Sequence, residues 1–179
     1  AITSIAPDQF NRHLDIIEAE GFTVLPLDEL VKRSMDASSG PEKGDEKIVA
    51  ITFDDAYRSI YTTAFPNLQA RGWPFTIFVA TRLIEEKNPH YLTWAQLAEM
   101  STHGATIANH TDSHTHMIRR LDAEMADHWK GRMRGELMTA KGLLAKHGLD
   151  SNLFAYPYGE YDEETLNLVG DLGMIGFGQ

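Results

Sequence analysis

Residues 47–55 read Lys-Ile-Val-Ala-Ile-Thr-Phe-Asp-Asp, and this stretch decides the fold. Residues 47–53 form an almost continuously apolar run, which is typical of a strand buried on both faces of a parallel sheet. Asp54 and Asp55 follow the run directly. In α/β barrels, functional side chains gather where strands end at their carboxyl side. The stretch therefore predicts a buried parallel strand that leads into a candidate site.

Short β-rich runs alternate with longer amphipathic stretches on both sides of this strand. Gly21, Gly72, Gly104 and Gly148 are placed to end predicted helices, and Thr93 with Gln96 has the spacing of a capping box. Asp122 is placed to cap the longest helix. The predicted helices cover residues 10–19, 27–35, 57–70, 93–104, 123–147 and 163–170; the predicted strands cover 22–25, 47–53, 74–80, 105–108, 153–156 and 174–177, and 36–45 is a surface loop. This order predicts a single α/β domain with a parallel sheet or barrel.

Composition narrows the classes of function. The 179 residues include 26 acidic and 16 basic residues, a formal charge of −10, which disfavours nucleic acid as a partner. No apolar run approaches the length of a transmembrane helix, roughly 18 residues or more. Cysteine is absent. A metal ion would therefore have to be held by histidine and carboxylate side chains.

Polar residues follow three of the predicted strands. Asp54 and Asp55 follow the first, His110 and His114 follow the second, and a Tyr-Pro-Tyr-Gly run at residues 156–159 follows the third. Because loops at the carboxyl ends of barrel strands converge on one face, we expect the three clusters to meet. Each cluster alone has a simpler interpretation: a pair of helix-capping aspartates, a histidine-rich surface loop, and a packed turn.

The spacing of His110 and His114 favours a metal site. Histidines at positions i and i+4 lie on one face if the segment turns helically, and neutral imidazole suits zinc and its first-row neighbours. His116 is a reminder that a nearby histidine need not be a ligand. Two histidines and one aspartate leave open positions for water and substrate. Successive strand residues point in different directions, so one of the two aspartates could bind the metal while the other serves as a base.

At these residues the sequence resembles the NodB-homology polysaccharide deacetylases. The three shared motifs are Thr52-Phe53-Asp54-Asp55, His110-Thr111-Asp112-Ser113-His114 and Tyr156-Pro157-Tyr158-Gly159, and the resemblance extends from about Phe10 to Gln179. Within the family the chain is most similar to enzymes that partly deacetylate poly-N-acetylglucosamine. The resemblance implies a distorted, incomplete (β/α) barrel with fewer than eight strands, formed by residues 1–179 as one catalytic domain.

The resemblance also implies a role for each motif residue. Asp55, His110 and His114 would bind a divalent metal, usually Zn²⁺. Asp54 would act as the base while a metal-bound water attacks the acetamide, and the Tyr158 N–H would stabilise the oxyanion. The remaining motif residues, implied to contact substrate, are Tyr156, Pro157 and Gly159. The partner would be an N-acetylglucosamine polymer or oligomer, and the location extracytoplasmic, in the periplasm or secreted from a bacterium.

The sequence departs from the family pattern in three places. Many members carry an arginine in the third motif that orients the base, and Ala155 stands at that position. The histidine that serves the family as general acid is not found before Gln179, and the family's opening strand lies upstream of Ala1. We therefore expect a barrel truncated at both ends, with the metal site intact and the acid missing.

Two other functions remain open from the sequence. A non-catalytic domain could keep the metal site and bind carbohydrate, which the missing acid favours and Asp54 disfavours. A different metal-dependent hydrolase could act on small amides or phosphoesters, although phosphate chemistry usually employs paired metals or clustered arginines, and no arginine cluster lies near these motifs. The sequence does not indicate the oligomeric state.

Overall fold

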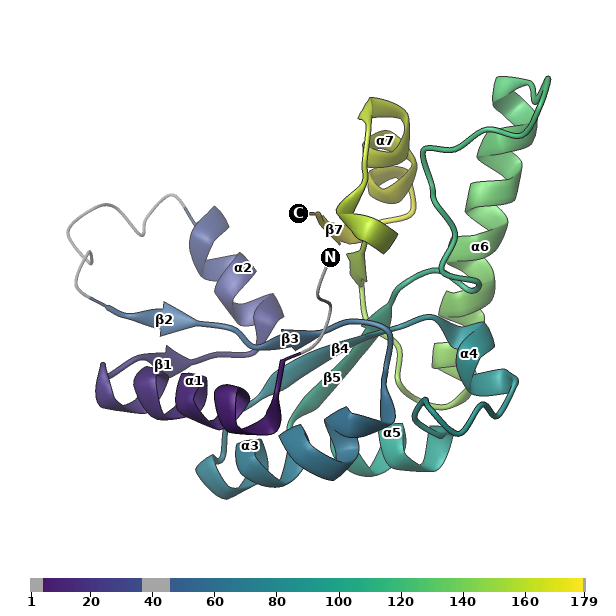
Figure 1. Ribbon diagram of the computed structural model, residues 1–179. Coiled ribbons are helices and arrows are strands. Elements are labelled where there is room, and N and C mark those ends of the chain that lie inside the picture. The colour runs from purple at the N-terminus through teal and green to yellow at the C-terminus, as the bar shows by residue number, and fades with distance from the viewer. Residues whose placement is uncertain (1–4, 37–45, 179) are drawn as a thin grey trace.

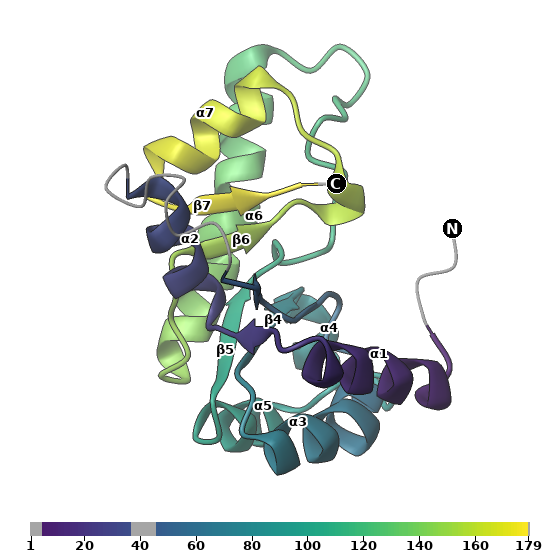
Figure 2. The same cartoon turned by 90° about the vertical axis from the view of Figure 1, so that its left-hand side faces the viewer.

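The computed structural model describes residues 5–36 and 46–178, and its main feature is a five-stranded parallel sheet. The strands follow one another in the order of the chain: β3 (Thr52–Phe53), β4 (Phe75–Val79), β5 (Ala105–Asn109), β6 (Leu153–Ala155) and β7 (Ile175–Phe177). Parallel neighbours require crossover connections, which carry the helices. The sheet curls into part of a barrel (Figures 1 and 2). The predicted incomplete α/β barrel is confirmed.

Two groups of helices pack around this sheet, and four further helical elements of the described residues lie outside these groups. Below it in Figure 1 lie α1 (Pro7–Ala19), α3 (Phe65–Arg71) and α5 (Trp94–Ser101). The second group, at the other end of the sheet, is α6 (Ala126–Lys146) and α7 (Glu163–Asp171). The remaining helical elements are α2 (Leu27–Met35), α4 (Thr81–Glu85), the π-helical turn η2 (Ile60–Ala64) and the 3₁₀ turn η3 (Pro157–Gly159). No helix in the described ranges combines the length and hydrophobicity needed to cross a membrane.

The side chains of β4 explain why its sequence is continuously apolar. All five of its residues are buried. Ile77 and Val79 join the core under α3 and α5, whereas Phe78 joins a separate cluster with Leu27 of α2 and Ala108 of β5. Both faces of the strand are thus covered, as in α/β proteins generally.

The predicted strand at 47–53 is divided between two sheets. Ile48–Val49 forms β2, which pairs in parallel with β1 (Thr23–Val24), whereas Thr52–Phe53 forms β3 and pairs with β4. The Ile51 carbonyl accepts a hydrogen bond of 2.9 Å from Thr76 N–H, so pairing with β4 begins immediately after the break. Both parts are also less buried than predicted: Ile48, Val49 and Phe53 are only partly buried and Thr52 is exposed, because β2 and β3 are each at the edge of their sheet.

Helix boundaries differ from the prediction where tertiary contacts replace local signals. The helix predicted at 57–70 is matched to within one residue: helical backbone runs from Arg58 through η2 and α3 to Arg71, and Tyr57 instead forms a bridge with Tyr91. Asp122 is not the cap of the long helix: α6 starts at Ala126, after Met125. The short helix α4 was not predicted. Of the loop predicted at 36–45, residues 37–45 lie outside the described residues.

Two predicted helix signals are confirmed. Thr93 and Gln96 form the expected capping box at the start of α5, with a 3.3 Å hydrogen bond from Gln96 N–H to Thr93 Oγ1 and one of 3.0 Å from Thr93 N–H to Gln96 Oε1. Gly72 ends α3 with a left-handed backbone at φ = 63°. These local signals set the end of α3 and the start of α5, the helices that precede β4 and β5 in the chain.

Candidate metal centre

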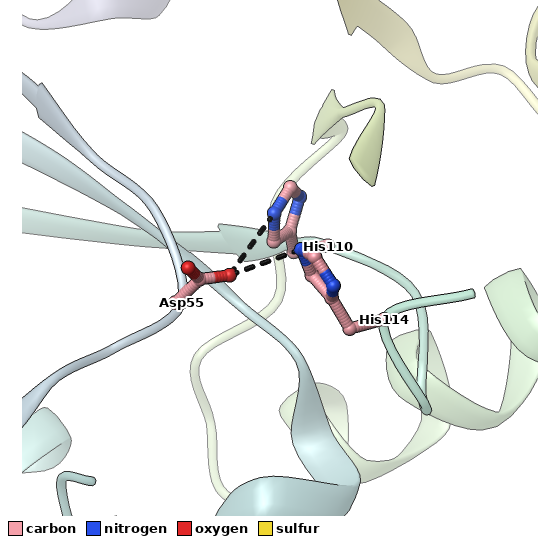
Figure 3. Close-up of side chains that lie close together, drawn as sticks. All are labelled: Asp55, His110 and His114. Atoms are coloured by element: carbon pink, nitrogen blue, oxygen red, sulfur yellow. Dashed lines mark ion pairs between the residues drawn. The ribbon is translucent and has the colours of Figure 1, made fainter. Parts of the chain in front are cut away.

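Side chains from two distant segments converge at the carboxyl ends of β3 and β5. Asp55 Oδ1 lies 3.6 Å from His110 Nε2 and 3.1 Å from His114 Nε2. One ligand atom from each of the three side chains lies within 4.8 Å of the others. Figure 3 shows the carboxylate facing both imidazoles. The three residues that the sequence predicted to be ligands are therefore brought together.

The donor set fits a first-row divalent metal. Zinc bonds to nitrogen and oxygen at about 2.0–2.1 Å, so two ligand atoms at a tetrahedral angle are roughly 3.4 Å apart. The separations of 3.1 and 3.6 Å between Asp55 Oδ1 and the two imidazole nitrogens lie on either side of that value. Two nitrogens and one oxygen leave further coordination positions open, which is the pattern of catalytic zinc sites. The residues would therefore hold zinc with little rearrangement.

His110 is prepared for this role by a backbone carbonyl. Its Nδ1 lies 2.8 Å from the Ala155 oxygen at the end of β6, and its side chain is almost fully buried. A ring nitrogen beside a carbonyl must carry the proton, so Nε2, which faces Asp55, is the nitrogen left to bind a metal. Ala155, the position at which the family resemblance implied an arginine, contributes to the site through its main chain instead.

The charge of Asp55 is stabilised by the two imidazoles. Hydrogen bonding to His110 and then to His114 holds the pKa of the Asp55 carboxyl well below its usual range, against the opposing effect of burial. The carboxylate is therefore ionised at neutral pH. An ionised carboxylate is the form that binds a metal ion.

Asp54 has the opposite electrostatic character. Partial burial, assisted by the negative charge of Asp55, raises the pKa of the Asp54 carboxyl, while His110 and His114 act in the other direction. A carboxylate with a raised pKa is a stronger base than an ordinary aspartate. No arginine is among the described groups that act on this pKa, consistent with the alanine at position 155.

A left-handed turn separates Asp54 from Asp55. Asp55 and Ala56 have φ values of 65° and 56°, and the Asp54 carbonyl accepts a 2.9 Å hydrogen bond from Ala56 N–H. Alternation along a strand had predicted that the two carboxylates diverge. Both aspartates lie beyond the end of β3, so strand alternation does not set the directions of their side chains.

The loop that carries the histidines is not helical. Thr111 and His114 have φ values of 65° and 56°, so the helical turn considered for the spacing of four residues does not form. Asn109 shapes this loop: its Oδ1 accepts from Thr111 N–H at 2.9 Å and its Nδ2 donates to the Leu137 carbonyl of α6 at 2.9 Å. The two imidazoles meet through an irregular loop that a buried side chain holds in place.

Two carboxylates that the sequence did not single out anchor the same loop. Asp112 accepts a 2.8 Å hydrogen bond from Thr81 Oγ1 and a bidentate pair from Arg82, at 2.7 and 3.1 Å, both at the start of α4. Glu136 of α6 accepts from Ser113 N–H and Ser113 Oγ, at 2.8 and 2.9 Å. The available signal was the polar character of Asp112 within the His-Thr-Asp-Ser-His motif. Glu136 gave no signal, since it is distant in sequence.

Tyr158 lies beside the histidines in a strained turn. Its φ is 62°, and its ring packs edge-on against His114, with centroids 4.6 Å apart. The hydrogen bonds of the turn are donated by Gly159 and Glu160 N–H, and within the described residues the Tyr158 N–H has no acceptor. A free backbone N–H beside the ligands is available to a developing oxyanion.

His116 and Glu160 support the Tyr158 ring from the other side. The His116 ring stacks on Tyr158 with centroids 3.6 Å apart and an interplanar angle of 8°, and its Nδ1 lies 2.8 Å from Glu160 Oε2. His116 does not belong to the Asp-His-His cluster. It is therefore a neighbour of the site rather than a ligand, as the sequence allowed.

The other residues of the third motif are placed differently from one another. Tyr156 is only 3% exposed, packs with Phe154 and Met174, and has a pKa raised by burial to about 12. Pro157 is also buried, whereas Gly159 is partly exposed. Contact between substrate and these three residues remains a prediction, and burial of the Tyr156 ring argues against a contact with that side chain.

A comparison of the sequence with models of known protein families identifies the family of this chain. The sequence model described as polysaccharide deacetylase matches residues 42–176 of the chain. The chain belongs to the NodB-homology polysaccharide deacetylase family. The matched range contains all three motifs, so family membership rests on the segments that build the site.

Similar proteins extend the comparison. YxkH of Bacillus subtilis is 31% identical over 170 residues, which is 92% of this chain and 54% of YxkH. The poly-β-1,6-N-acetyl-D-glucosamine N-deacetylase of Staphylococcus epidermidis is 26% identical over 185 residues, or 96% of this chain and 59% of that enzyme. The deacetylase PplD of Streptococcus pyogenes, solved in complex with acetate, superposes with a TM-score of 0.81 at 27% identity, over 96% of this chain and 71% of PplD. This deacetylase chain thus spans little more than half the length of these two curated relatives.

Proposed function

We propose that this chain is the catalytic core of a metal-dependent enzyme that removes acetyl groups from N-acetylglucosamine units of a polysaccharide. One observation carries the proposal: Asp55, His110 and His114 face a common point, and Asp54 lies beside them with a raised pKa. The relatives named for poly-β-1,6-N-acetyl-D-glucosamine favour that polymer class. Because those relatives act on a polymer outside the cytoplasm, we propose the periplasm or the cell exterior as the location.

Zinc bound to the three ligands would polarise the acetamide carbonyl and lower the pKa of water. Asp54 then supplies the base, since its carboxylate takes a proton from water as the acetamide carbon is attacked. The Tyr158 N–H donates a hydrogen bond to the carbonyl oxygen as negative charge develops there. The Ala155 carbonyl keeps the His110 Nε2 lone pair directed at the centre throughout. The C–N bond then breaks as the proton held by Asp54 passes to the departing nitrogen, which gives acetate and a free amine on the sugar.

An acetate-release assay tests the proposal. The zinc-loaded protein is incubated with β-1,6-linked and β-1,4-linked N-acetylglucosamine oligomers, and Asp54→Asn serves as the matched control. Because the general-acid histidine that the family resemblance implies is not found in the chain, we expect the unaltered protein to release little acetate, with more from the β-1,6 series, and the variant to release none at equal zinc content. Equal release by the variant would remove Asp54 as the base. Binding of oligomers without any release would favour a carbohydrate-binding domain that lacks turnover.

A further inference from the structure

The strand between the two ligand-bearing strands ends in a hollow. β4 lies between β3 and β5 in the sheet, and its carboxyl-terminal connection contributes none of the three ligands. Residues 84–96 of that connection, together with Arg58, instead line a hollow of about 440 Å³. Ligand-binding pockets in proteins commonly have volumes of roughly 300–1,000 Å³. The lining therefore belongs to a connection that leaves the same edge of the sheet as the two segments that carry the candidate ligands.

The hollow is joined to the metal site by paired backbone. Leu92 N–H donates to the Ala56 carbonyl at 2.9 Å, and Arg58 N–H donates to the His90 carbonyl at 2.8 Å. Ala56 directly follows the ligand Asp55. The wall of the hollow is therefore hydrogen-bonded to the segment that carries a metal ligand, and the two sites are held at a fixed separation.

A pair of stacked tyrosines lies along this junction. The Tyr57 and Tyr91 rings stack with centroids 5.1 Å apart and an interplanar angle of 23°. Burial and the neighbouring Tyr57 raise the pKa of Tyr91, and the charge of Asp55 adds to the effect. Tyr91 thus lines the hollow and also lies within electrostatic reach of the metal ligand. A chain of sugars passing from one site to the other would follow these rings.

The lining has the chemistry that binds a sugar ring. Trp94 is held in place, since it stacks on His147 with centroids 4.1 Å apart and its Nε1 donates to Glu85 at 2.6 Å. Sugar rings bind to amphipathic aromatic side chains that are fixed in this way, with polar groups at the edge to fix orientation. Arg58 and Lys87 line the hollow, and neither charged group has a hydrogen-bond or ion-pair partner among the described residues. They are free to donate to hydroxyl and acetamide oxygens.

We infer that this hollow is a subsite for a second N-acetylhexosamine unit of the polysaccharide whose acetamide lies at the metal centre. The inference rests on the proposed function and adds to it a reason why the substrate is a polymer: binding energy comes from a unit that does not react. A single sugar would occupy only the metal site. Longer oligomers would bind more tightly because they also reach Arg58 and Trp94.

The test measures binding, so that it does not depend on turnover. Zinc-loaded Asp54→Asn protein is titrated calorimetrically with N-acetylglucosamine and with its β-1,6-linked pentamer. The same titrations are made with a double variant that carries Arg58→Ala as well as Asp54→Asn. Arg134→Ala is the matched control, because Arg134 is an exposed arginine of α6 that does not line the hollow.

Arg58→Ala should weaken the affinity for the pentamer by about tenfold, as expected for a lost hydrogen bond to a charged group. The affinity for the monosaccharide should be unchanged. Arg134→Ala should change neither. Equal pentamer affinity with and without Arg58, in protein that retains zinc, would overturn the subsite while leaving the proposed deacetylation intact. If the unaltered protein releases no acetate, the proposed function fails. The pentamer titration then still decides whether the hollow binds the polymer.

Discussion

His110 shows how the fold orients one candidate metal ligand. The Ala155 carbonyl fixes the proton on Nδ1, burial prevents the ring from rotating into water, and Nε2 faces Asp55 at 3.6 Å. His114 is held less firmly: its side chain is 22% exposed. The two ligands therefore differ in how much rearrangement their removal would cause.

His114→Ala should abolish stoichiometric zinc binding and leave the protein folded. The His114 side chain is partly exposed and lies outside the hydrophobic clusters, so its loss removes a donor without opening the core. Elemental analysis of purified protein, together with circular dichroism, checks both parts. His103→Ala removes a histidine outside the cluster and is the control. Undiminished zinc in His114→Ala would show that this imidazole is not a ligand.

His116→Ala should lower kcat by about tenfold and leave KM and zinc content unchanged. The reason is positional: the variant removes the ring that stacks on Tyr158 and the link to Glu160, so the Tyr158 N–H is aimed less well. Complete loss of such a donor costs about a hundredfold or more. His116→Phe, which keeps a stacked ring, should recover most of the rate. A fall in zinc content instead would make His116 part of the metal site.

At the scale of elements, the histidine loop is tied to two helices. Asp112 holds it to the start of α4, and Glu136 holds it to α6. The following segment is tied to α6 as well. Glu124 accepts from Arg132 Nε and Nη2, at 2.8 and 2.6 Å, and from Leu121 N–H at 3.0 Å. The loop is irregular but well connected, which keeps both imidazoles in register with Asp55.

Glu124→Gln should destabilise the protein in a way that depends on pH. Hydrogen bonding to Arg132 lowers the pKa of Glu124 to about 2, below its ordinary value of 4.5. A carboxyl whose pKa is lower in the folded state stabilises the fold above the unfolded pKa, and this stabilisation is lost as pH falls through the folded pKa. The variant should melt roughly 2 °C below the unaltered protein near pH 7.

Melting curves of the metal-free protein from pH 7 down to about pH 3 provide the check. The gap between variant and unaltered protein should narrow as pH falls below 4.5, because the unfolded glutamate then binds a proton. Glu163→Gln, at an exposed position in the first turn of α7, is the control. A gap that stayed constant over this range would mean that the charge of Glu124 does not stabilise the fold.

At the scale of the whole molecule, a bound metal would link the ends of β3 and β5, which lie on either side of β4 in the sheet. A ligand that binds the folded state alone, at a hundred times its Kd, stabilises it by about 2.7 kcal/mol. Removing zinc with a chelator should therefore lower Tm by roughly 5–10 °C for a chain of this size. Differential scanning calorimetry with and without chelator measures the shift. His114→Ala should show no shift, and an equal shift in that variant would place the zinc elsewhere.

The sequence predicted the architecture because strand burial and helix ends are local signals. The apolar run 74–80, the capping box at Thr93 and the left-handed Gly72 each depend on neighbours in the chain. It did not predict the change of sheet within 47–53 or the late start of α6. Those boundaries are set by pairing with β1 and by the loop at 121–125, which are tertiary contacts.

The candidate site, like the fold, was predicted only in part. Asp55, His110 and His114 could be predicted from residue type and their positions at strand ends. The Ala155 carbonyl could not, because every residue has a carbonyl and only the fold decides which one faces His110. Glu136 likewise reaches Ser113 from a helix distant in sequence. Groups that bind the metal are chemically distinctive, whereas groups that orient them are common to all proteins.

Among the described residues, seven non-glycine residues have positive φ; four of them lie in the three motifs (Asp55, Thr111, His114 and Tyr158), and a fifth, Ala56, directly follows the first motif. For such residues the left-handed conformation costs about 1–2 kcal/mol each. Selection of variants for heat resistance alone should therefore enrich glycine at these positions, beginning with Ala56, which has the least side chain to lose. Selection for turnover should retain Asp55, His114 and Tyr158. Parallel directed-evolution campaigns from one library would then diverge at the same few codons.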